Sequence, residues 1–330
     1  MLLQNKKVLV TGAGGFIGSH LVESLLTKGA KVRAFVKYDS RSDWGMLSDL
    51  PLESQKSIEV ISGDVRDPFF VRKAVQGCDC VFHLAALIGI PYSYIAPNDY
   101  VSVNIQGTVN VLQACYDERT PRLVHTSTSE TYGTAQYIPI DEKHPLQGQS
   151  PYSASKIGAD KMAESYYKSF ELPVVTVRPF NTFGPRQSAR AFIPTVISQA
   201  LTRDKLTLGS LEPVRDLTFV KDTAEGFITV GLCDKAIGQV VNLGVGSGET
   251  IGVVVRKTLK LLGKEDMPIE QDSSRVRPAK SEVMRLISNN VLAMEMCGWQ
   301  AKYSLEQGLA ATIEWMKNNI EKFRPDIYVL

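Results

Sequence analysis

A glycine-rich stretch near the start of the chain, TGAGGFIGSHL, constrains the fold more than any other feature. It follows the apolar run KKVLVTG and opens a stretch with helical periodicity, so its glycines lie in a turn between a strand and a helix. Gly12 permits the tight turn, Gly15 lets the backbone approach a pyrophosphate, and Gly18 allows close helix–strand packing. The N-terminus of the helix, at Phe16 and Ile17, then faces the phosphates. The stretch predicts a dinucleotide-binding turn.

The chain up to Phe180 alternates apolar, β-rich runs with helical stretches. The expected strands cover residues 6–12, 31–37, 57–64, 79–86, 122–128 and 172–180, and the expected helices cover 16–28, 68–76, 99–116 and 152–170. The strands are nearly continuous in apolar residues, as parallel strands covered by helices on both faces are. This rhythm predicts an α/β fold, a doubly wound Rossmann-type parallel sheet whose ligand lies beyond the carboxyl ends of the strands.

The alternation breaks after Phe180. A loop-like segment precedes a helix near 195–202, a hairpin-type region is expected at 207–220, and further helices are expected at 221–232, 250–262 and 305–323. The run QVVNLG at 239–244 is expected to return to the sheet as its last strand. We therefore expect a small discontinuous C-terminal α/β substrate domain. The dinucleotide-binding domain comprises residues 1–180 and about 217–245, and the substrate domain about 181–216 and 246–330.

Charge and composition exclude several classes of function. A formal net charge of +2 without any local cluster of Lys and Arg argues against nucleic-acid binding. The most apolar run, VFHLAALIGI, is too short to cross a bilayer, and no signal peptide is recognised. Five cysteines without a CxxC pair and four scattered histidines predict free thiols in a reducing cytoplasm and no metal site.

The segment PYSASK places Tyr152 and Lys156 four residues apart, so on a helix both side chains face the same way. A nearby ammonium favours the phenolate, as does the positive charge of a nicotinamide. A tyrosine with a lowered pKa takes a hydroxyl proton while hydride leaves the same carbon. Thr128 ends the strand upstream and is expected beside them.

The choice between NAD and NADP stays open. An NAD site usually carries an acid at the end of the second strand, but the sequence there is AFVKYDSRS. Lys37 occupies this neighbourhood, Asp39 comes slightly late, and Arg41 follows. The basic residues suit a 2′-phosphate or form a solvated loop.

At this point the chain resembles the extended short-chain dehydrogenase/reductase superfamily, in its nucleotide-sugar epimerase/dehydratase branch. The resemblance covers essentially the whole chain and rests on the segments TGAGGFIG, GDVRD, HLAA, NIQGT, TSTSETYG, PYSASK, RPFNTFGPRQ and VRDLTFVKD. Two longer segments, at 125–160 and 178–194, look like the 4,6-dehydratases of the legionaminic acid pathway, which act on GDP- or UDP-linked N-acetylglucosamine.

The resemblance implies a role for each matching residue. Thr128 would hydrogen-bond the 4-hydroxyl of the sugar, Tyr152 would be the base, and Lys156 would tune it and hold the nicotinamide ribose. Glu130 would remove the C5 proton. Ser129 stands where glucose 4,6-dehydratases have Asp, so the proton for the departing hydroxyl would come from Glu130 itself, from Ser129 or from a water. A tightly bound, internally recycled NAD or NADP would contact Asp64, Val65, Leu84, Ala85, Ala86 and Asn104.

The resemblance also implies a nucleotide-sugar substrate site and a dimer. Asn181, Arg186 and Arg215 would serve the diphosphate and nucleotide, with Arg275 and Arg277 in the same cleft and Ser93 near the sugar. A homodimer would form through the helices at 99–116 and 152–170, paired as a four-helix interface. GDP and UDP are not distinguished.

Three alternatives share the fold. A UDP-sugar 4-epimerase needs only Thr, Tyr and Lys, so Glu130 argues against it. A UDP-glucuronate decarboxylase also shows TSE but needs a cationic pocket for the C6 carboxylate. A non-catalytic, cofactor-sensing protein of this fold usually loses the Tyr or Lys, and both are present here.

Overall fold

The computed structural model describes residues 3–272 and 282–323. Its central feature is a seven-stranded sheet in the order β11-β6-β5-β4-β1-β2-β3, parallel throughout. The strands are β1 Lys7–Thr11, β2 Lys31–Lys37, β3 Ile58–Gly63, β4 Cys80–His83, β5 Leu123–Thr126, β6 Val174–Pro179 and β11 Val240–Leu243. The predicted doubly wound sheet is confirmed, including the return of 239–244 as its last strand.

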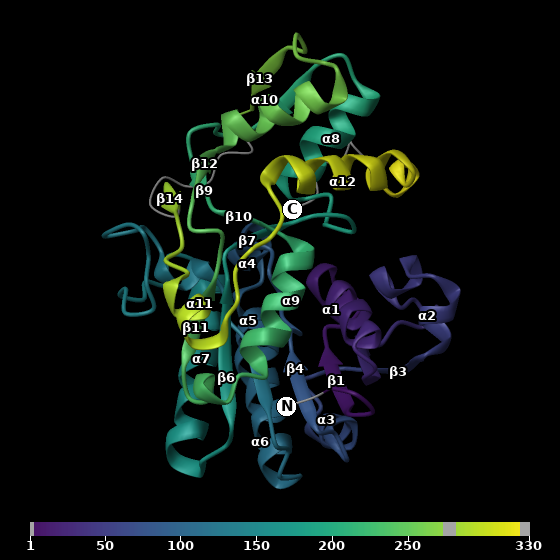
Figure 1. The fold of residues 1–330 in the computed structure, drawn as a ribbon, viewed down its shortest axis with the longest axis vertical. Helices are drawn as coiled ribbons and strands as arrows, with labels where there is room; N and C mark the ends of the chain where they lie inside the picture. The colour runs from purple at the N-terminus through teal and green to yellow at the C-terminus, as the bar shows by residue number, and fades with distance from the viewer. Residues whose placement is uncertain (1–2, 273–281, 324–330) are drawn as a thin grey trace.

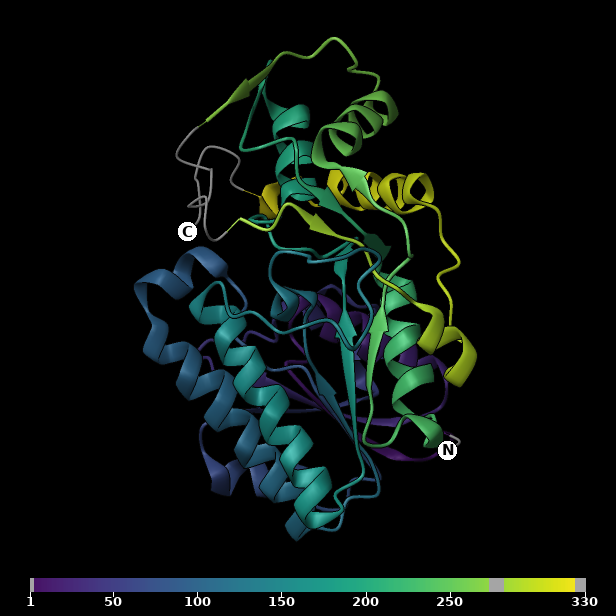
Figure 2. The same ribbon diagram turned by 90° about the vertical axis from the view of Figure 1, so that its left-hand side faces the viewer.

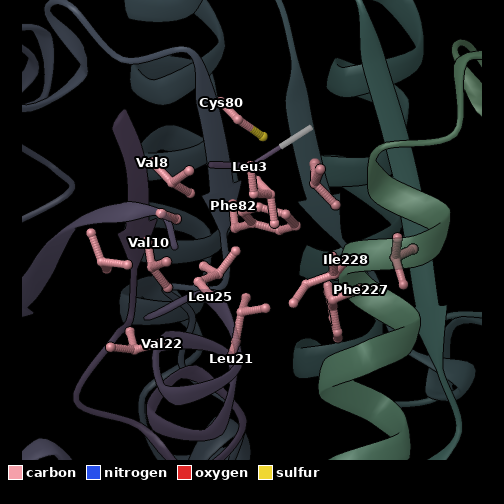
Figure 3. Close-up of a cluster of buried hydrophobic side chains, with 14 of the residues drawn as sticks. Leu3, Val8, Val10, Leu21, Val22, Leu25, Cys80, Phe82, Phe227 and Ile228 are labelled. Atoms are coloured by element: carbon pink, nitrogen blue, oxygen red, sulfur yellow. The ribbon is translucent and has the colours of Figure 1, made fainter. Parts of the chain in front are cut away.

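Helices cover both faces of this sheet (Figure 1). On one face lie α1 Phe16–Thr27 and α9 Val220–Gly231, and on the other α3 Pro68–Val75, α6 Gly107–Asp117 and α7 Pro151–Phe170. Val8 and Val10 pack against α1 and α9 (Figure 3), whereas Leu9 points to the opposite face and packs with α3, α6 and α7. Burying such a side chain stabilises the fold by roughly 1.5–3 kcal/mol, so apolar strands sandwiched by helices are favoured.

The expected helix at 99–116 is not uniform. It begins as α5 Pro97–Tyr100, continues as the π-helical segment η2 Val101–Gln106, and becomes α6. Such wide turns are frequent at functional sites. Here the π-helical segment carries Asn104, whose side chain reaches the loop after β4.

A smaller unit lies beyond the carboxyl ends of the strands, at the top of Figures 1 and 2. Its elements are β7 Asn181–Phe183, α8 Phe192–Thr202, β8 Leu206–Leu208, β9 Val214–Arg215, β10 Leu217–Phe219, β12 Glu249–Thr250, α10 Ile251–Leu262, β13 Ile269–Gln271, β14 Arg285–Leu286 and α12 Leu305–Lys317. Phe183, Ile197, Val254 and Ile313 share its core, so distant segments of the chain build it together.

The hairpin expected at 207–220 is wrong. Its strands pair with distant partners instead: β9 lies between β12 and β14, while β10 pairs in parallel with β7. The single residue between β9 and β10 is Asp216, whose buried carboxylate accepts hydrogen bonds from the N–H groups of Val245, Gly246 and Ser288. These bonds hold the chain extended where a hairpin would need a turn.

The remaining elements are short. They are η1 Gly45–Asp49, α2 Leu52–Lys56, α4 Ile90–Ile95, η3 Ser129–Tyr132, η4 Asp234–Ala236, α11 Val291–Cys297 and η7 Ile320–Lys322. Ala293 of α11 and Trp299 pack into the same core as α1 and α9, so this late segment returns to the sheet. The division into two domains stays a prediction. Across the described ranges, no helix has the length and apolar character needed to span a membrane.

Candidate active site

A cavity of about 770 Å³ opens where the parallel strands end. The glycine-rich turn forms one wall, and the segments after β5 and β6 form another. Gly12 has φ +69°, and a Cβ on Gly18 would stand 2.2 Å from the carbonyl oxygen of Gly12. The turn therefore requires glycine at both positions. Gly12, Gly15, Phe16, Ile17 and Gly18 all line the cavity, as the sequence predicted for the turn.

Helix α1 meets this cavity with an open N-terminus. Its N-cap, Gly15, offers no side-chain hydrogen bond, and no acid stands in the first turn. The first N–H groups of a helix carry partial positive charge and bind anions well. The residues present therefore fit the pyrophosphate of a dinucleotide.

A second cavity of about 380 Å³ adjoins the first and shares Gly12, Val36, Lys37 and Ala86 with it. Its lining also includes the predicted cofactor residues Asp64, Val65 and Ala85, and Leu84 lines the larger cavity. Its size and its place beside the glycine turn suit the adenosine end of a dinucleotide.

The charged groups at and after the ends of β2 and β3 differ in whether they have a partner of opposite charge. Asp64 is bound twice by the Arg66 side chain, which holds the pKa of that carboxyl below its usual range. Asp39 accepts a hydrogen bond from the N–H of Arg41. Lys37 makes no ion pair with any described residue and lines both cavities.

Tyr152 and Lys156 lie one turn apart on α7 and both line the large cavity. The helix begins with a capping box between Ser150 and Ser153 and with Pro151 at its first position, which places Tyr152 in the first turn. Lys156 Nζ donates to the carbonyl oxygen of Thr126 at 2.6 Å. Burial lowers the pKa of Lys156 to about 8.

The expected lowering of the tyrosine pKa is not produced by the protein's own groups. Burial raises the pKa of Tyr152, a hydrogen bond with Thr128 opposes the rise, and the charge of Glu130 adds to it. The ammonium of Lys156 donates to a backbone carbonyl, and Lys156 is not among the groups that lower the pKa of this phenol.

Thr128, Ser129 and Glu130 lie at the start of η3 and line the cavity with Tyr152. Thr128 is the N-cap of this turn: its Oγ1 accepts the N–H of Glu130 at 3.3 Å, and its carbonyl accepts the hydroxyl of Thr131 at 2.8 Å. These bonds fix the backbone on either side of Glu130. The carboxylate, the phenol and the lysine therefore belong to one cavity.

Several other predicted residues lie elsewhere. Asn181 lines the large cavity, but Ser93, Asn104, Arg186 and Arg215 line neither one. Ser93 Oγ donates to the carbonyl of Ile90 within its own short helix. Arg275 and Arg277 fall outside the described residues.

Asn104 supports the cavity from behind. Its side-chain amide accepts the N–H of Leu87, donates to the carbonyl of Leu87 and donates to Ser155 Oγ. It thereby ties the loop after β4 to α7, two segments that both contribute lining residues.

Arg186 is buried against α1 rather than directed at the cavity. Its guanidinium contacts Glu23 Oε2 at 2.6 Å and the ring of buried His20, and its φ of +66° turns the backbone sharply. Arg215 is also buried, with Nη1 on the carbonyl of Val214 and Nη2 at 3.3 Å from Glu282. Neither arrangement leaves the arginine in the cavity lining.

Other residues that line the cavity were not singled out in the sequence as site residues. Those from the strand ends and the loops that follow are Ile88, Ile90, Thr126, Ser127, Pro179, Phe180, Thr182, Gln187, Ser188 and Ala191, and those near β2 are Tyr38, Asp43 and Trp44. Position at the carboxyl end of a strand is the signal that would have identified Thr126, Ser127 and Pro179.

Comparison with known proteins agrees with this geometry. Residues 9–312 match the family described as GDP-mannose 4,6 dehydratase. The chain belongs to this family. It thereby falls within the NAD-dependent epimerase/dehydratase superfamily, as the sequence analysis inferred.

Individual relatives include both dehydratases and epimerases. The chain is 31% identical to the dTDP-glucose 4,6-dehydratase of Xanthomonas campestris, over 94% of this chain and 93% of that protein. It is 30% identical to a UDP-glucose 4-epimerase of Mycolicibacterium smegmatis, over 94% and 99%. The structure of DesIV, a dTDP-glucose 4,6-dehydratase from Streptomyces venezuelae with NAD and TYD bound, matches with a TM-score of 0.87 at 29% identity, covering 97% and 99%.

Proposed function

We propose that this protein is an NAD(P)-dependent 4,6-dehydratase of GDP- or UDP-N-acetylglucosamine, in legionaminic acid or related cell-surface sugar biosynthesis. The observation that carries the proposal is the meeting of Glu130, Tyr152 and Lys156 in one cavity behind the glycine turn. Family membership supports the reaction class. The sugar and the pathway rest on the resemblance of the segments at 125–160 and 178–194.

The chain's own residues divide the proton chemistry among them. Tyr152 takes the proton of the sugar 4-hydroxyl, with Thr128 hydrogen-bonded beside it. Once C4 is a ketone the C5 proton is acidic, and Glu130 removes it. Glu130, now neutral, gives that proton to the hydroxyl leaving C6, or does so through Ser129. When bound, the nicotinamide supplies a hydride acceptor at the first step, a hydride donor at the last, and a positive charge beside the phenol.

The positive charge matters because the protein alone leaves the pKa of Tyr152 raised. An adjacent cation favours the phenolate. Lys156, Phe16 and Ile17 line the cavity where the nicotinamide half and the pyrophosphate would lie. Lys37 in the cavity lining supports NADP, whereas the NAD bound to DesIV supports NAD. The affinities measured by titrating the protein with NAD and with NADP distinguish the two cofactors.

A homodimer through α6 and α7 forms part of the proposal. The two helices lie side by side on an outer face of the molecule (Figure 2). Tyr116 of α6 and Phe170 of α7 are 44% and 48% exposed, with their ring centroids 5.3 Å apart, and Val101 of the preceding segment η2 is 51% exposed. Large exposed apolar side chains gathered on one face favour self-association.

A cytoplasmic location is also part of the proposal. The five cysteines are all free thiols, which supports a reducing, cytoplasmic location.

The alternative decarboxylase fits the cavity less well. A C6 carboxylate needs a cation near the reacting carbon, and the described cations in the lining are Lys37 and Lys156. Lys37 lies at the adenosine end, and Lys156 is committed to Thr126. A 4-epimerase has no need for the carboxylate of Glu130.

Product analysis tests the proposal. The purified protein is incubated with GDP-N-acetylglucosamine, UDP-N-acetylglucosamine and UDP-glucuronate, with the Tyr152→Phe variant as the control. Loss of one water from an N-acetylglucosamine nucleotide is expected. Loss of carbon dioxide from UDP-glucuronate, or a product of unchanged mass, would overturn the assignment.

A further inference from the structure

A buried polar network lies directly behind Lys156. Asp160, one turn further along α7, accepts hydrogen bonds from His125 Nε2 at 3.0 Å, Ser127 Oγ at 2.5 Å and Arg178 Nη2 at 2.7 Å. Arg178 Nε also donates to Ser127 Oγ at 3.0 Å, which closes the network. A carboxylate held by three donors from β5, the segment after it and β6 cannot rotate freely.

The side chains of this network and of Lys156 are almost completely buried. Asp160 is 6% exposed, Arg178 2% and Lys156 4%. A buried charge needs a partner of opposite sign, since transfer out of water otherwise costs several kcal/mol. Asp160 and Arg178 form such a pair, but Lys156 makes no ion pair with any described residue.

The other titratable groups around Lys156 give it no negative partner. His83 on β4 and His125 on β5 are buried, and burial lowers the pKa of each, so both imidazoles are neutral at pH 7. Arg178 on β6 adds positive charge, and Tyr152 on the same helix stays a neutral phenol. Glu130, on η3, lies on the cavity side with Tyr152.

The spacing of Lys156 and Asp160 places a negative charge one helix turn from the lysine, although the two form no direct ion pair. Residues four apart on a helix lie on the same face, so the ammonium and the carboxylate face the same buried space. The field of Asp160 raises the pKa of Lys156, against the larger opposing effect of burial.

We propose that Asp160 is a positioning residue that keeps Lys156 protonated inside the fold, with Arg178, Ser127 and His125 holding its carboxylate in place. This role rests on the proposed function only in so far as Lys156 serves the reaction. The charged state of Lys156 can be measured without any turnover. Arg178 competes for the same carboxylate, so the two cations share one anion.

Titration of Lys156 by NMR tests this proposal directly. The protein is labelled with lysine carrying ¹³C at the ε position, and the Lys156 signal is assigned by its disappearance in Lys156→Met. Asp160→Asn alone leaves the buried Arg178 without a partner and is at risk of unfolding. The double variant Asp160→Asn/Arg178→Gln removes one charge of each sign, and the thermal melt verifies that it folds.

The proposal predicts opposite shifts for two variants. Compared with Arg178→Gln, the double variant should lower the pKa of Lys156 by about one unit or more, because the two proteins differ only in the carboxylate of Asp160. In Arg178→Gln alone this pKa rises, because Asp160 then serves Lys156 only. Glu164→Gln is the matched control, since Glu164 is an acid on the same helix but pairs with exposed Lys161 and Lys168. It should leave the titration unchanged.

The same pKa of Lys156 in the double variant as in Arg178→Gln, or a fall from the wild-type value in Arg178→Gln, would overturn the role of Asp160. Either result leaves the dehydratase assignment untouched, because no product is measured. Conversely, absence of water loss in the product assay would not affect the titration.

Discussion

The ammonium of Lys156 donates to the carbonyl oxygen of Thr126 at 2.6 Å, inside the fold and 4% exposed. Burial lowers the pKa of this lysine from 10.5 to about 8. Between these two values the unfolded chain holds a proton that the folded chain has released. The unfolded state then binds more protons, so the free energy of unfolding rises with pH in this window.

This linkage predicts a difference between the wild-type protein and Lys156→Met. From pH 8 to pH 10.5 the wild type should gain up to about 3 kcal/mol relative to the variant, which lacks the titrating group. Denaturant unfolding at a series of pH values measures the difference. Lys161→Met, an exposed lysine on the same helix, serves as the control. Parallel curves for the wild type and Lys156→Met would show that Lys156 has an ordinary pKa.

The glycine turn predicts contrasting effects for two neighbouring substitutions. A Cβ on Gly18 would stand 2.2 Å from the carbonyl oxygen of Gly12, whereas a Cβ on Gly15 comes no closer than 3.2 Å to the same atom. Gly18→Ala should therefore destabilise the protein by about 3 kcal/mol or more. Gly15→Ala should change stability by less than about 1 kcal/mol but weaken cofactor binding. Thermal unfolding and cofactor titration measure both, and equal stabilities would refute the packing role of Gly18.

Because Glu130 and Tyr152 are separate groups in one cavity, substitution of Glu130 should block water elimination without blocking oxidation at C4. Glu130→Gln removes the proposed base for C5 but leaves Tyr152 and Lys156 intact, so the cofactor should still be reduced by substrate. Dehydration should slow by roughly 10²–10⁴-fold. Tyr152→Phe should abolish both steps. Stopped-flow absorbance of the reduced cofactor, followed by product analysis, distinguishes them. Full dehydration by Glu130→Gln would assign the C5 base to another residue.

Arg186 is expected to matter for stability rather than for phosphate binding. Its contacts with Glu23 and His20 clamp the loop after β7 onto α1. Because the Glu23 side chain is 44% exposed, losing the pair in Arg186→Met should cost only about 1–3 kcal/mol. The KM for the nucleotide sugar should change less than tenfold. A normal melting temperature together with a large increase in KM would show instead that Arg186 binds the diphosphate of the substrate.

The parts of the fold that were predictable are those with strong periodic patterns. All seven strands of the main sheet and the helices α1, α3, α7 and α9 follow from apolar runs and helical spacing. The pairings of β9 and β10 did not follow, because strands of two or three residues carry no pattern that selects a partner. The carboxylate of Asp216 stabilises this arrangement by accepting hydrogen bonds from N–H groups about 30 to 70 residues away in sequence.

The same limit applies to the site. Motif spacing pointed to Tyr152 and Lys156 on one helix face and to Thr128 at a strand end, the family resemblance pointed to Glu130, and all four line the cavity. Motif spacing could not assign Arg186, because a loop residue with positive φ can direct its side chain either way. Nor could it reveal the network around Asp160, whose members come from three elements and meet only in the folded chain.

An isotope-transfer measurement tests the central claim most directly. The substrate is UDP- or GDP-N-acetylglucosamine carrying deuterium at C4, incubated in ordinary water with the cofactor-loaded protein. The account predicts that the deuterium appears at C6 of the same product molecule, while C5 takes its hydrogen from solvent. Deuterium that stays at C4 of a recovered or inverted sugar, or that is lost to solvent, would contradict it.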